Sequence, residues 1–259
     1  MLPNLNLGPL ALPVPALTFL AGIWICTSLA EKYAPHFGLN SSKISSLIIL
    51  MLVTGIIGAR ISYIFRYPEA FFQHPLDILS RSPGLLDPIG GIALAVIAGF
   101  IFGQKKGLPL WQTLDTLTLG LAALAICIGL SHLASGDAFG EPTSLPWGIY
   151  LWGEYRHPTQ IYEIILFGLL FGFILFNIKT RAAPRPGVLF LGFLASSSAI
   201  YLFIEAFRGD SLLFLNSYRT VQLIAWLIMA LSLWGIWEHL GKQNEANQEI
   251  ILPDQEEEK

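Results

Sequence analysis

Seven stretches of mostly apolar residues, each about as long as a membrane span, run through this chain and limit what it can fold into. They lie at roughly residues 13–30, 45–65, 88–104, 110–133, 159–178, 187–207 and 219–240. An α-helix needs about 20 mostly apolar residues to cross the hydrocarbon core of a bilayer. Only 13% of the 259 residues are charged, which is about half the share found in soluble domains. The pattern therefore predicts an all-α membrane protein with about seven transmembrane helices.

The lysines and arginines predict the orientation of these spans, because cytoplasmic segments carry an excess of both residues. With the N-terminus outside and the C-terminus in the cytoplasm, nine of the 15 fall on the inner side. The six on the outer side are all arginines: Arg60, Arg66, Arg81, Arg156, Arg208 and Arg219. The planar guanidinium group binds phosphate through two hydrogen bonds, so these arginines suit an anionic lipid headgroup. The alternative is that they only anchor the interface or pair with carboxylates.

The remaining composition predicts the domain organisation and excludes some functions. We expect residues 1–242 to form the membrane domain and the acidic residues 243–259 to be a disordered cytoplasmic tail. The long outer loops are rich in aromatic residues and are expected to form a small extracytoplasmic cap. The first twelve residues contain no lysine or arginine, which argues against a cleaved signal peptide. No block of basic residues indicates a nucleic-acid partner.

One polar segment, residues 156–163, runs directly into an apolar span. A structural interpretation makes His157 a helix cap, Gln160 its capping-box partner, and Arg156 and Glu163 an ion pair. A functional interpretation starts from the helix N-terminus, whose free N–H groups and positive dipole end suit a phosphate, with Arg156 beside them. Both interpretations remain open from the sequence.

Two further groups of polar residues lie near the predicted outer ends of the spans. His132 precedes a glycine-rich stretch that contains Asp137 and Gly140, and a histidine can take a proton near neutral pH. Alternatively, His132 has only a structural role, and its imidazole forms a hydrogen bond with a neighbouring carbonyl group or with Asp137. Glu205 and Arg208 share one helix face and can pair, and a carboxylate inside a membrane span is a functional candidate.

Together these motifs resemble the prolipoprotein diacylglyceryl transferase family. The matching features are Gly58-Ala59-Arg60, Gly90-Gly91, Gly136-Asp137 with Gly140, the run Arg156-His157-Pro158-Thr159-Gln160 with Glu163, and Glu205-Ala206-Phe207-Arg208. The resemblance implies a seven-span protein of the bacterial plasma (inner) membrane. It implies transfer of a diacylglyceryl group from phosphatidylglycerol, or a similar anionic phospholipid, to the cysteine of a prolipoprotein signal peptide. It implies neither a cofactor nor a metal. Cys26 and Cys127 each lie within an apolar run, and we expect them to be small buried apolar residues.

The chain departs from the family pattern at four positions. The family's histidine before Gly-Gly, usually assigned as the base, falls on Ile89, and the arginine that opens the signature loop falls on Gly129. An asparagine three places later falls on His132, and an arginine in the sixth span falls on Tyr201. Because isoleucine cannot accept a proton, two alternatives stay open. The chain is then an inactive paralogue that binds a phospholipid or lipoprotein, or a related lipid transferase with altered specificity.

These considerations assign the site residues as follows. The catalytic candidates are His132, as the base, and Asp137; the substrate-binding candidates are Arg60, Gly140, Arg156, His157, Gln160, Glu163, Glu205 and Arg208. Within the second set, Arg60, Arg156 and Arg208 are expected to contact phosphate.

Overall fold

The computed structural model describes residues 4–7, 10–73, 83–180, 185–215 and 217–251. The long helices are α1 (Val14–Tyr33), α2 (Ser41–Arg66), α4 (Pro88–Lys106), α5 (Leu110–Ser135), α6 (Thr159–Thr180), α7 (Val188–Glu205) and α8 (Thr220–Ile251). Short helices are η1 (Ala34–Phe37), α3 (Pro68–Gln73) and η3 (Pro83–Leu85), and the strands form hairpins β1–β2 (Asn4–Leu7, Leu10–Pro13), β3–β4 (Ile149–Leu151, Glu154–Arg156) and β5–β6 (Leu213–Phe214, Tyr218–Arg219). Within the described residues, seven helices are long and apolar enough to cross a membrane. The predicted all-α, seven-span class is confirmed, and the chain is a multi-pass membrane protein.

The described chain divides into two compact units. The first unit comprises Met1–Ser28 and Leu117–Lys259, and the second comprises Leu29–Thr116. The boundaries fall inside α1 and α5, so each of these helices contributes to both units.

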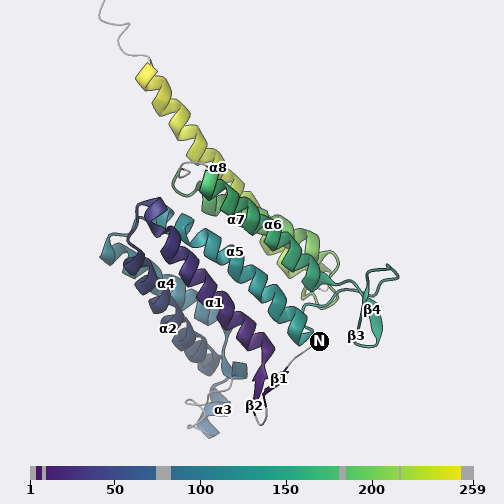
Figure 1. Ribbon diagram of the computed structural model, residues 1–259. Helices are drawn as coiled ribbons and strands as arrows, with labels where there is room; N and C mark the ends of the chain where they lie inside the picture. The colour runs from purple at the N-terminus through teal and green to yellow at the C-terminus, as the bar shows by residue number, and fades with distance from the viewer. Residues whose placement is uncertain (1–3, 8–9, 74–82, 181–184, 216, 252–259) are drawn as a thin grey trace, which may run out of the picture. The chain divides into compact units, whose positions relative to one another are not determined.

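In the first unit, α7 packs against both α6 and α8 (Figure 1). Glycines bring α1 and α5 close together, because a Cβ on Gly120 would lie 2.6 Å from the Cys26 carbonyl oxygen and one on Gly22 would lie 2.7 Å from Cys127 Cβ. Small residues allow this close backbone approach between membrane helices. Both cysteines are buried and unpaired, consistent with their expected role as small apolar residues.

In the second unit, α2 and α4 pack closely through small residues. A Cβ on Gly91 would lie 2.9 Å from the Gly55 carbonyl oxygen. Asp87 caps α4, because its carboxylate accepts hydrogen bonds from the Ile89 backbone N–H at 3.1 Å and from the Ser62 hydroxyl at 2.8 Å. The Ser62 hydrogen bond is the main reason why the pKa of Asp87 lies below its ordinary range, and it outweighs the opposing effect of desolvation.

The C-terminal helix α8 continues to Ile251, past the tail boundary expected at residue 242. Residues 252–259 of the predicted acidic tail lie outside the described residues. The disorder and cytoplasmic placement of the tail, like the orientation of the spans, stay predictions.

Candidate active site

At one end of α5, α6 and α7, three loop segments are joined side by side by backbone hydrogen bonds. The segment Phe139–Thr143 lies between the strand residues that lead into α6 and the residues that follow α7. The bonds are Glu141 N to Phe207 O at 2.8 Å, Gly209 N to Phe139 O at 2.9 Å, His157 N to Glu141 O at 3.0 Å and Thr143 N to Tyr155 O at 2.8 Å. This arrangement fixes the beginning of α6 against the end of α7.

Gly140 lies at the tightest point of this arrangement. A Cβ at this position would lie 2.6 Å from His157 Cβ, so a side chain would push the segments apart. Nearby, Ala138 has a φ of 53°, a left-handed conformation that is strained for any residue except glycine. Its carbonyl oxygen accepts a buried 2.6 Å hydrogen bond from the Thr159 hydroxyl, which holds the strained loop on α6.

The beginning of α6 does not carry the expected capping box. Gln160 is fully buried, and its amide nitrogen donates to the Asp137 carbonyl oxygen at 2.8 Å instead of reaching back to His157. The Gln160 Oε1 atom is shielded from solvent and has no hydrogen-bond partner within the described residues. The His157 ring lies against Phe207, with ring centroids 5.0 Å apart, and its Nδ1 lies 3.4 Å from the Tyr162 hydroxyl. The capping-box prediction is therefore wrong, because loop contacts compete for the same side chain.

A three-residue hydrogen-bonded group links α5, α6 and α7. Glu163 Oε2 lies 3.0 Å from His132 Nδ1, and Glu163 Oε1 accepts a hydrogen bond from the Tyr201 hydroxyl at 3.4 Å. The side chain of Glu163 is 5% exposed and that of His132 is 31% exposed. The alternative pairings expected from the sequence, Glu163 with Arg156 and His132 with Asp137, are therefore wrong.

The absence of a side chain at Gly129 helps to form this group. A Cβ there would lie 2.9 Å from Ile164 Cγ1 and 3.4 Å from Glu163 Cγ. Gly129 lies on α5 about one turn before His132, so its small size lets α6 approach closely enough for Glu163 to reach the imidazole. The glycine at position 129 is therefore consistent with the His132–Glu163 contact.

Arg208 and Glu205 form a second polar group after the end of α7. Arg208 donates to both carboxylate oxygens of Asp210, at 2.9 and 3.1 Å, and its Nε lies 3.7 Å from Glu205 Oε2. Glu205 is buried, and neither of its carboxylate oxygens has a hydrogen-bond partner within the described residues. Burial lowers the pKa of Arg208, but the hydrogen bonds and attraction from Asp210 and the charge of Glu205 outweigh it and raise that pKa above its ordinary value. Arg208 therefore keeps its charge beside an incompletely paired buried carboxylate.

The guanidinium of Arg156 is largely engaged by the protein itself. It pairs with Glu154 at 2.8 Å, donates to the carbonyl oxygens of Leu151 and Gly140 at 3.2 and 3.3 Å, and lies over the Phe139 ring. These contacts indicate that Arg156 organises the loops. The phosphate contact expected for it stays a prediction.

Arg219, which is not among the predicted site residues, has a similar position. It donates to the carbonyl oxygens of Glu205 and Arg208 and to the Ser211 hydroxyl, and it pairs with Glu141 at 2.5 Å. Arg219 is the last residue of β6, directly before α8. The sequence marked it only as one of six outer arginines, because only the folded chain brings it to the end of α7.

Arg60 belongs to the second unit. There its Nη1 donates to the Leu85 carbonyl oxygen at 3.0 Å, and its guanidinium lies 5.8 Å from the centre of the Phe71 ring. Its assignment as a phosphate contact stays a prediction.

The group formed by His132, Glu163 and Tyr201 has the chemistry of an oriented base. A carboxylate only accepts hydrogen bonds, so a neutral His132 donates from Nδ1 to Glu163 and keeps an unprotonated Nε2. A histidine held in this way can accept a proton at Nε2, and the carboxylate stabilises the resulting imidazolium. Arg208, which lies near this group, provides a permanent positive charge.

Comparisons with known proteins give a consistent result. The sequence profile of the family described as prolipoprotein diacylglyceryl transferase matches residues 4–238. Two similar proteins are the phosphatidylglycerol–prolipoprotein diacylglyceryl transferases of Nostoc sp. (30% identity, covering 92% of this chain and 89% of the relative) and Clostridioides difficile (32% identity, covering 87% and 90%). The protein of the same name from Synechococcus elongatus is 27% identical over 89% of this chain and 84% of its own length. The chain therefore belongs to the prolipoprotein diacylglyceryl transferase family.

Proposed function

We propose that this protein transfers the diacylglyceryl group of phosphatidylglycerol to the cysteine thiol of a prolipoprotein. The family membership supports this activity, and the His132–Glu163 contact at 3.0 Å carries the proposal for this chain. It offers a proton acceptor in a member whose residue at the usual base position is Ile89.

His132 Nε2 acts as the base in the first step. It removes the proton of the cysteine thiol, because the thiolate is the nucleophile and the thiol is not. Glu163 accepts the Nδ1 hydrogen bond and stabilises the imidazolium that forms. Tyr201 donates to the other oxygen of Glu163 and holds that carboxylate toward His132.

The group transfer then exchanges one bond for another. The thiolate sulfur attacks the glyceryl carbon that carries the phosphate ester, the C–S bond forms and the C–O bond breaks. Glycerol-1-phosphate leaves with the electron pair of the C–O bond, and the proton held by His132 goes to the released phosphate. Arg208, with Arg156 as a further candidate, stabilises the negative charge on the leaving group.

The other site residues position these groups. Gln160 holds the Asp137 loop on α6, Gly140 permits the close contact with His157, and Glu205 lies beside Arg208. Asp137 acts here through its backbone carbonyl as an organiser of the loop. We place the protein in a bacterial plasma (inner) membrane with this end of the helices on the extracytoplasmic side, where prolipoprotein signal peptides are accessible.

The test uses purified protein, phosphatidylglycerol and a peptide with a lipoprotein signal cysteine. The expected product is a peptide that carries a diacylglyceryl thioether, detected by mass spectrometry. The matched variant is His132→Asn, which keeps an amide near Nδ1 but cannot take the proton, and it should lose nearly all turnover. Absence of the thioether product at every concentration of the unmodified protein would reject the proposal.

A further inference from the structure

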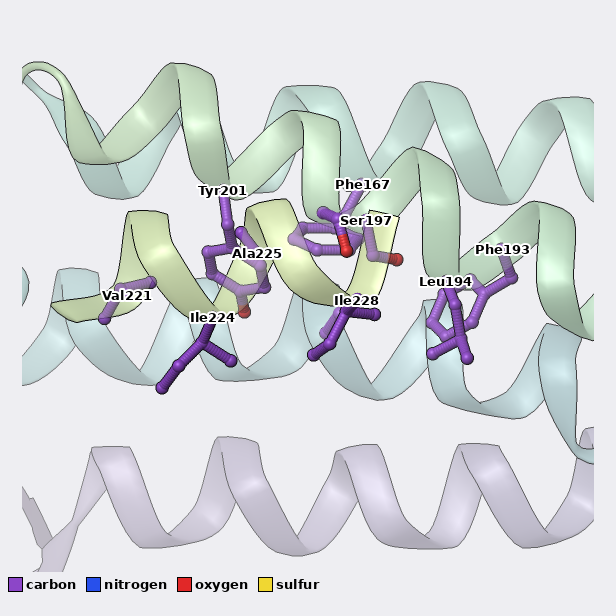
Figure 2. A pocket seen from close by; sticks show the side chains of 11 residues that line it. Phe167, Phe193, Leu194, Ser197, Tyr201, Val221, Ile224, Ala225 and Ile228 are labelled. Carbon is purple, nitrogen blue, oxygen red and sulfur yellow. The ribbon is translucent and has the colours of Figure 1, made fainter. Parts of the chain in front are cut away.

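An apolar cavity in the first unit offers no counter-ion to a charged ligand. It has a volume of about 360 Å³, lies among α5, α6, α7 and α8, and is lined by no charged residue among those that the structure describes. Figure 2 shows that its side chains carry only carbon atoms and hydroxyl oxygens, such as those of Tyr201 and Ser197. Positive charges without a counter-ion gather instead in the second unit, on residues that the proposed reaction does not use.

Hydrogen bonds bring three helix termini together at one end of the second unit. The Ser41 hydroxyl, at the beginning of α2, donates to the Glu31 carbonyl oxygen near the end of α1 at 2.7 Å. The ammonium group of Lys43, in the first turn of α2, donates to the Lys106 carbonyl oxygen at the end of α4 at 3.0 Å. Four exposed lysines therefore gather at this end, and we call them the lysine cluster: Lys32, Lys43, Lys105 and Lys106.

The protein does not neutralise the lysine cluster. Within the described part of the chain, none of its four ammonium groups forms an ion pair with a carboxylate. By contrast, Arg66 at the other end of α2 pairs with Asp87 at 3.9 Å. Lys43 uses one of its three N–H donors on the Lys106 carbonyl oxygen, so two remain. Like charges held together repel each other, so the cluster favours a bound anion.

The surroundings of the cluster indicate what kind of anion it binds. The Lys106 ammonium lies over the ring of Phe102, 5.9 Å from the ring centre. Lys105 shares a face of α4 with Ile101 and Ile97, which precede it by four and eight residues and are exposed. A positive charge followed along one face by apolar side chains matches an amphiphile with an anionic head and a hydrocarbon chain. A soluble anion has no part that would use the apolar face.

We propose that the lysine cluster binds the phosphate-bearing headgroup of an anionic phospholipid, and that the hydrocarbon chain of this lipid lies along Ile101 and Ile97. Basic groups at the ends of membrane helices recognise such headgroups. The bound phosphate offsets the repulsion among the four lysines and thereby stabilises the second unit. The lipid is a structural ligand held by residues that take no part in the proposed reaction, so this inference does not rest on the proposed function.

The test measures lipid binding to the full-length protein in a neutral detergent by native mass spectrometry. The probes are tetraoleoyl cardiolipin, whose two phosphates can each contact an ammonium group, and dioleoyl phosphatidylcholine, which has no net charge. The double variant Lys105→Gln/Lys106→Gln should lower the affinity for cardiolipin on the order of tenfold and leave the affinity for phosphatidylcholine unchanged. The backbone carbonyl of residue 106 stays in this variant, so the contact with Lys43 is kept.

Two further double variants serve as controls. Lys179→Gln/Arg185→Gln removes two exposed cations from the first unit, which gives the same change in net charge, and it should leave the affinity for cardiolipin unchanged. Lys105→Arg/Lys106→Arg keeps both charges and should bind cardiolipin within twofold of the unmodified protein. Cardiolipin should also raise the thermal midpoint of the unmodified protein more than that of Lys105→Gln/Lys106→Gln, and this difference should shrink at high salt.

The outcomes decide between a lipid site and its alternatives. An unchanged affinity for cardiolipin in Lys105→Gln/Lys106→Gln, or an equal fall in Lys179→Gln/Arg185→Gln, would overturn the inference. Equal thermal stabilisation by inorganic phosphate at the same ionic strength would also overturn it, because the ligand would then be a free anion. The expected shift in a protein that forms no thioether product would support the lipid site and reject only the transferase proposal.

Discussion

Replacing Glu163 with glutamine is expected to slow the transfer reaction about tenfold. The substitution keeps the shape of the side chain but removes the charge that lies 3.0 Å from His132 Nδ1. A hydrogen bond to a charged group contributes about 1.5–3 kcal/mol, and a neutral one contributes about 0.5–1.5 kcal/mol. The imidazolium formed in the transition state would therefore lose about 1.5 kcal/mol of stabilisation. Because a tenfold change in rate corresponds to about 1.4 kcal/mol, kcat/KM should fall by about one order of magnitude.

The assay for this prediction is a double-mutant cycle. Thioether formation is measured for the unmodified protein, Glu163→Gln, His132→Asn and the double variant, at saturating and limiting phosphatidylglycerol. If Glu163 acts through His132, its substitution should have almost no further effect once His132 is already asparagine. Tyr201→Phe is the accompanying control, because it removes only the longer 3.4 Å hydrogen bond and should reduce the rate less than Glu163→Gln. Equal losses from Glu163→Gln in both backgrounds, or a rate within twofold of the unmodified protein, would refute the reasoning.

Three further predictions concern the framework around the site. Gly140→Ala should destabilise the protein by about 1–3 kcal/mol and lower its thermal midpoint, because the new Cβ would collide with His157. Gly172→Ala is the control and should not lower the midpoint, because Gly172 has open surroundings. Thr159→Val should lower the free energy of unfolding by about 1–3 kcal/mol, because it leaves the buried Ala138 carbonyl oxygen without a hydrogen bond. Thr159→Ser keeps the hydroxyl and should recover most of the thermal midpoint in the same melt. The pKa of Asp87 lies below its ordinary range, so its carboxylate stabilises the second unit at neutral pH, and this contribution disappears as the pH falls through the lowered pKa. The difference in thermal midpoint between the unmodified protein and Asp87→Asn, which keeps the cap, should therefore shrink on acidification; a difference that is constant with pH would contradict this.

Most of the fold could be predicted from the sequence because membrane spans have a strong signal. Each span needs about 20 apolar residues, and the predicted ranges coincide closely with the helices of the structure; the range 45–65, for example, falls inside α2. The close helix packing of the second unit depends on Gly55, Gly58 and Gly91, and an apolar span does not show which of its residues will face a neighbouring helix.

The site was harder to predict, because its contacts depend on which helix ends meet. The sequence identified His132 and Glu163 as polar residues at the mouth of two spans, but it could not show that they face each other. It offered Arg156 as the partner of Glu163, whereas the folded chain turns Arg156 toward Glu154 and backbone carbonyl groups. Local spacing predicts partners within one helix, and these partners come from different elements.

Arg208 illustrates the same limit in a different way. Its pairing with Glu205 was predicted from their spacing of three residues, and the structure contains this pair at 3.7 Å. The shorter contacts are with Asp210, two residues beyond Arg208 in the turn after α7. A helix-based pattern could not find this partner, because the chain has left the helix at that point.

The most direct test of the account is growth of bacterial cells depleted of their own prolipoprotein diacylglyceryl transferase. Expression of this chain should restore growth and the diacylglyceryl thioether on a reporter lipoprotein, and His132→Asn at the same membrane level should restore neither. Failure of the unmodified chain, or equal rescue by His132→Asn, would contradict the claim that His132 and Glu163 activate the cysteine thiol.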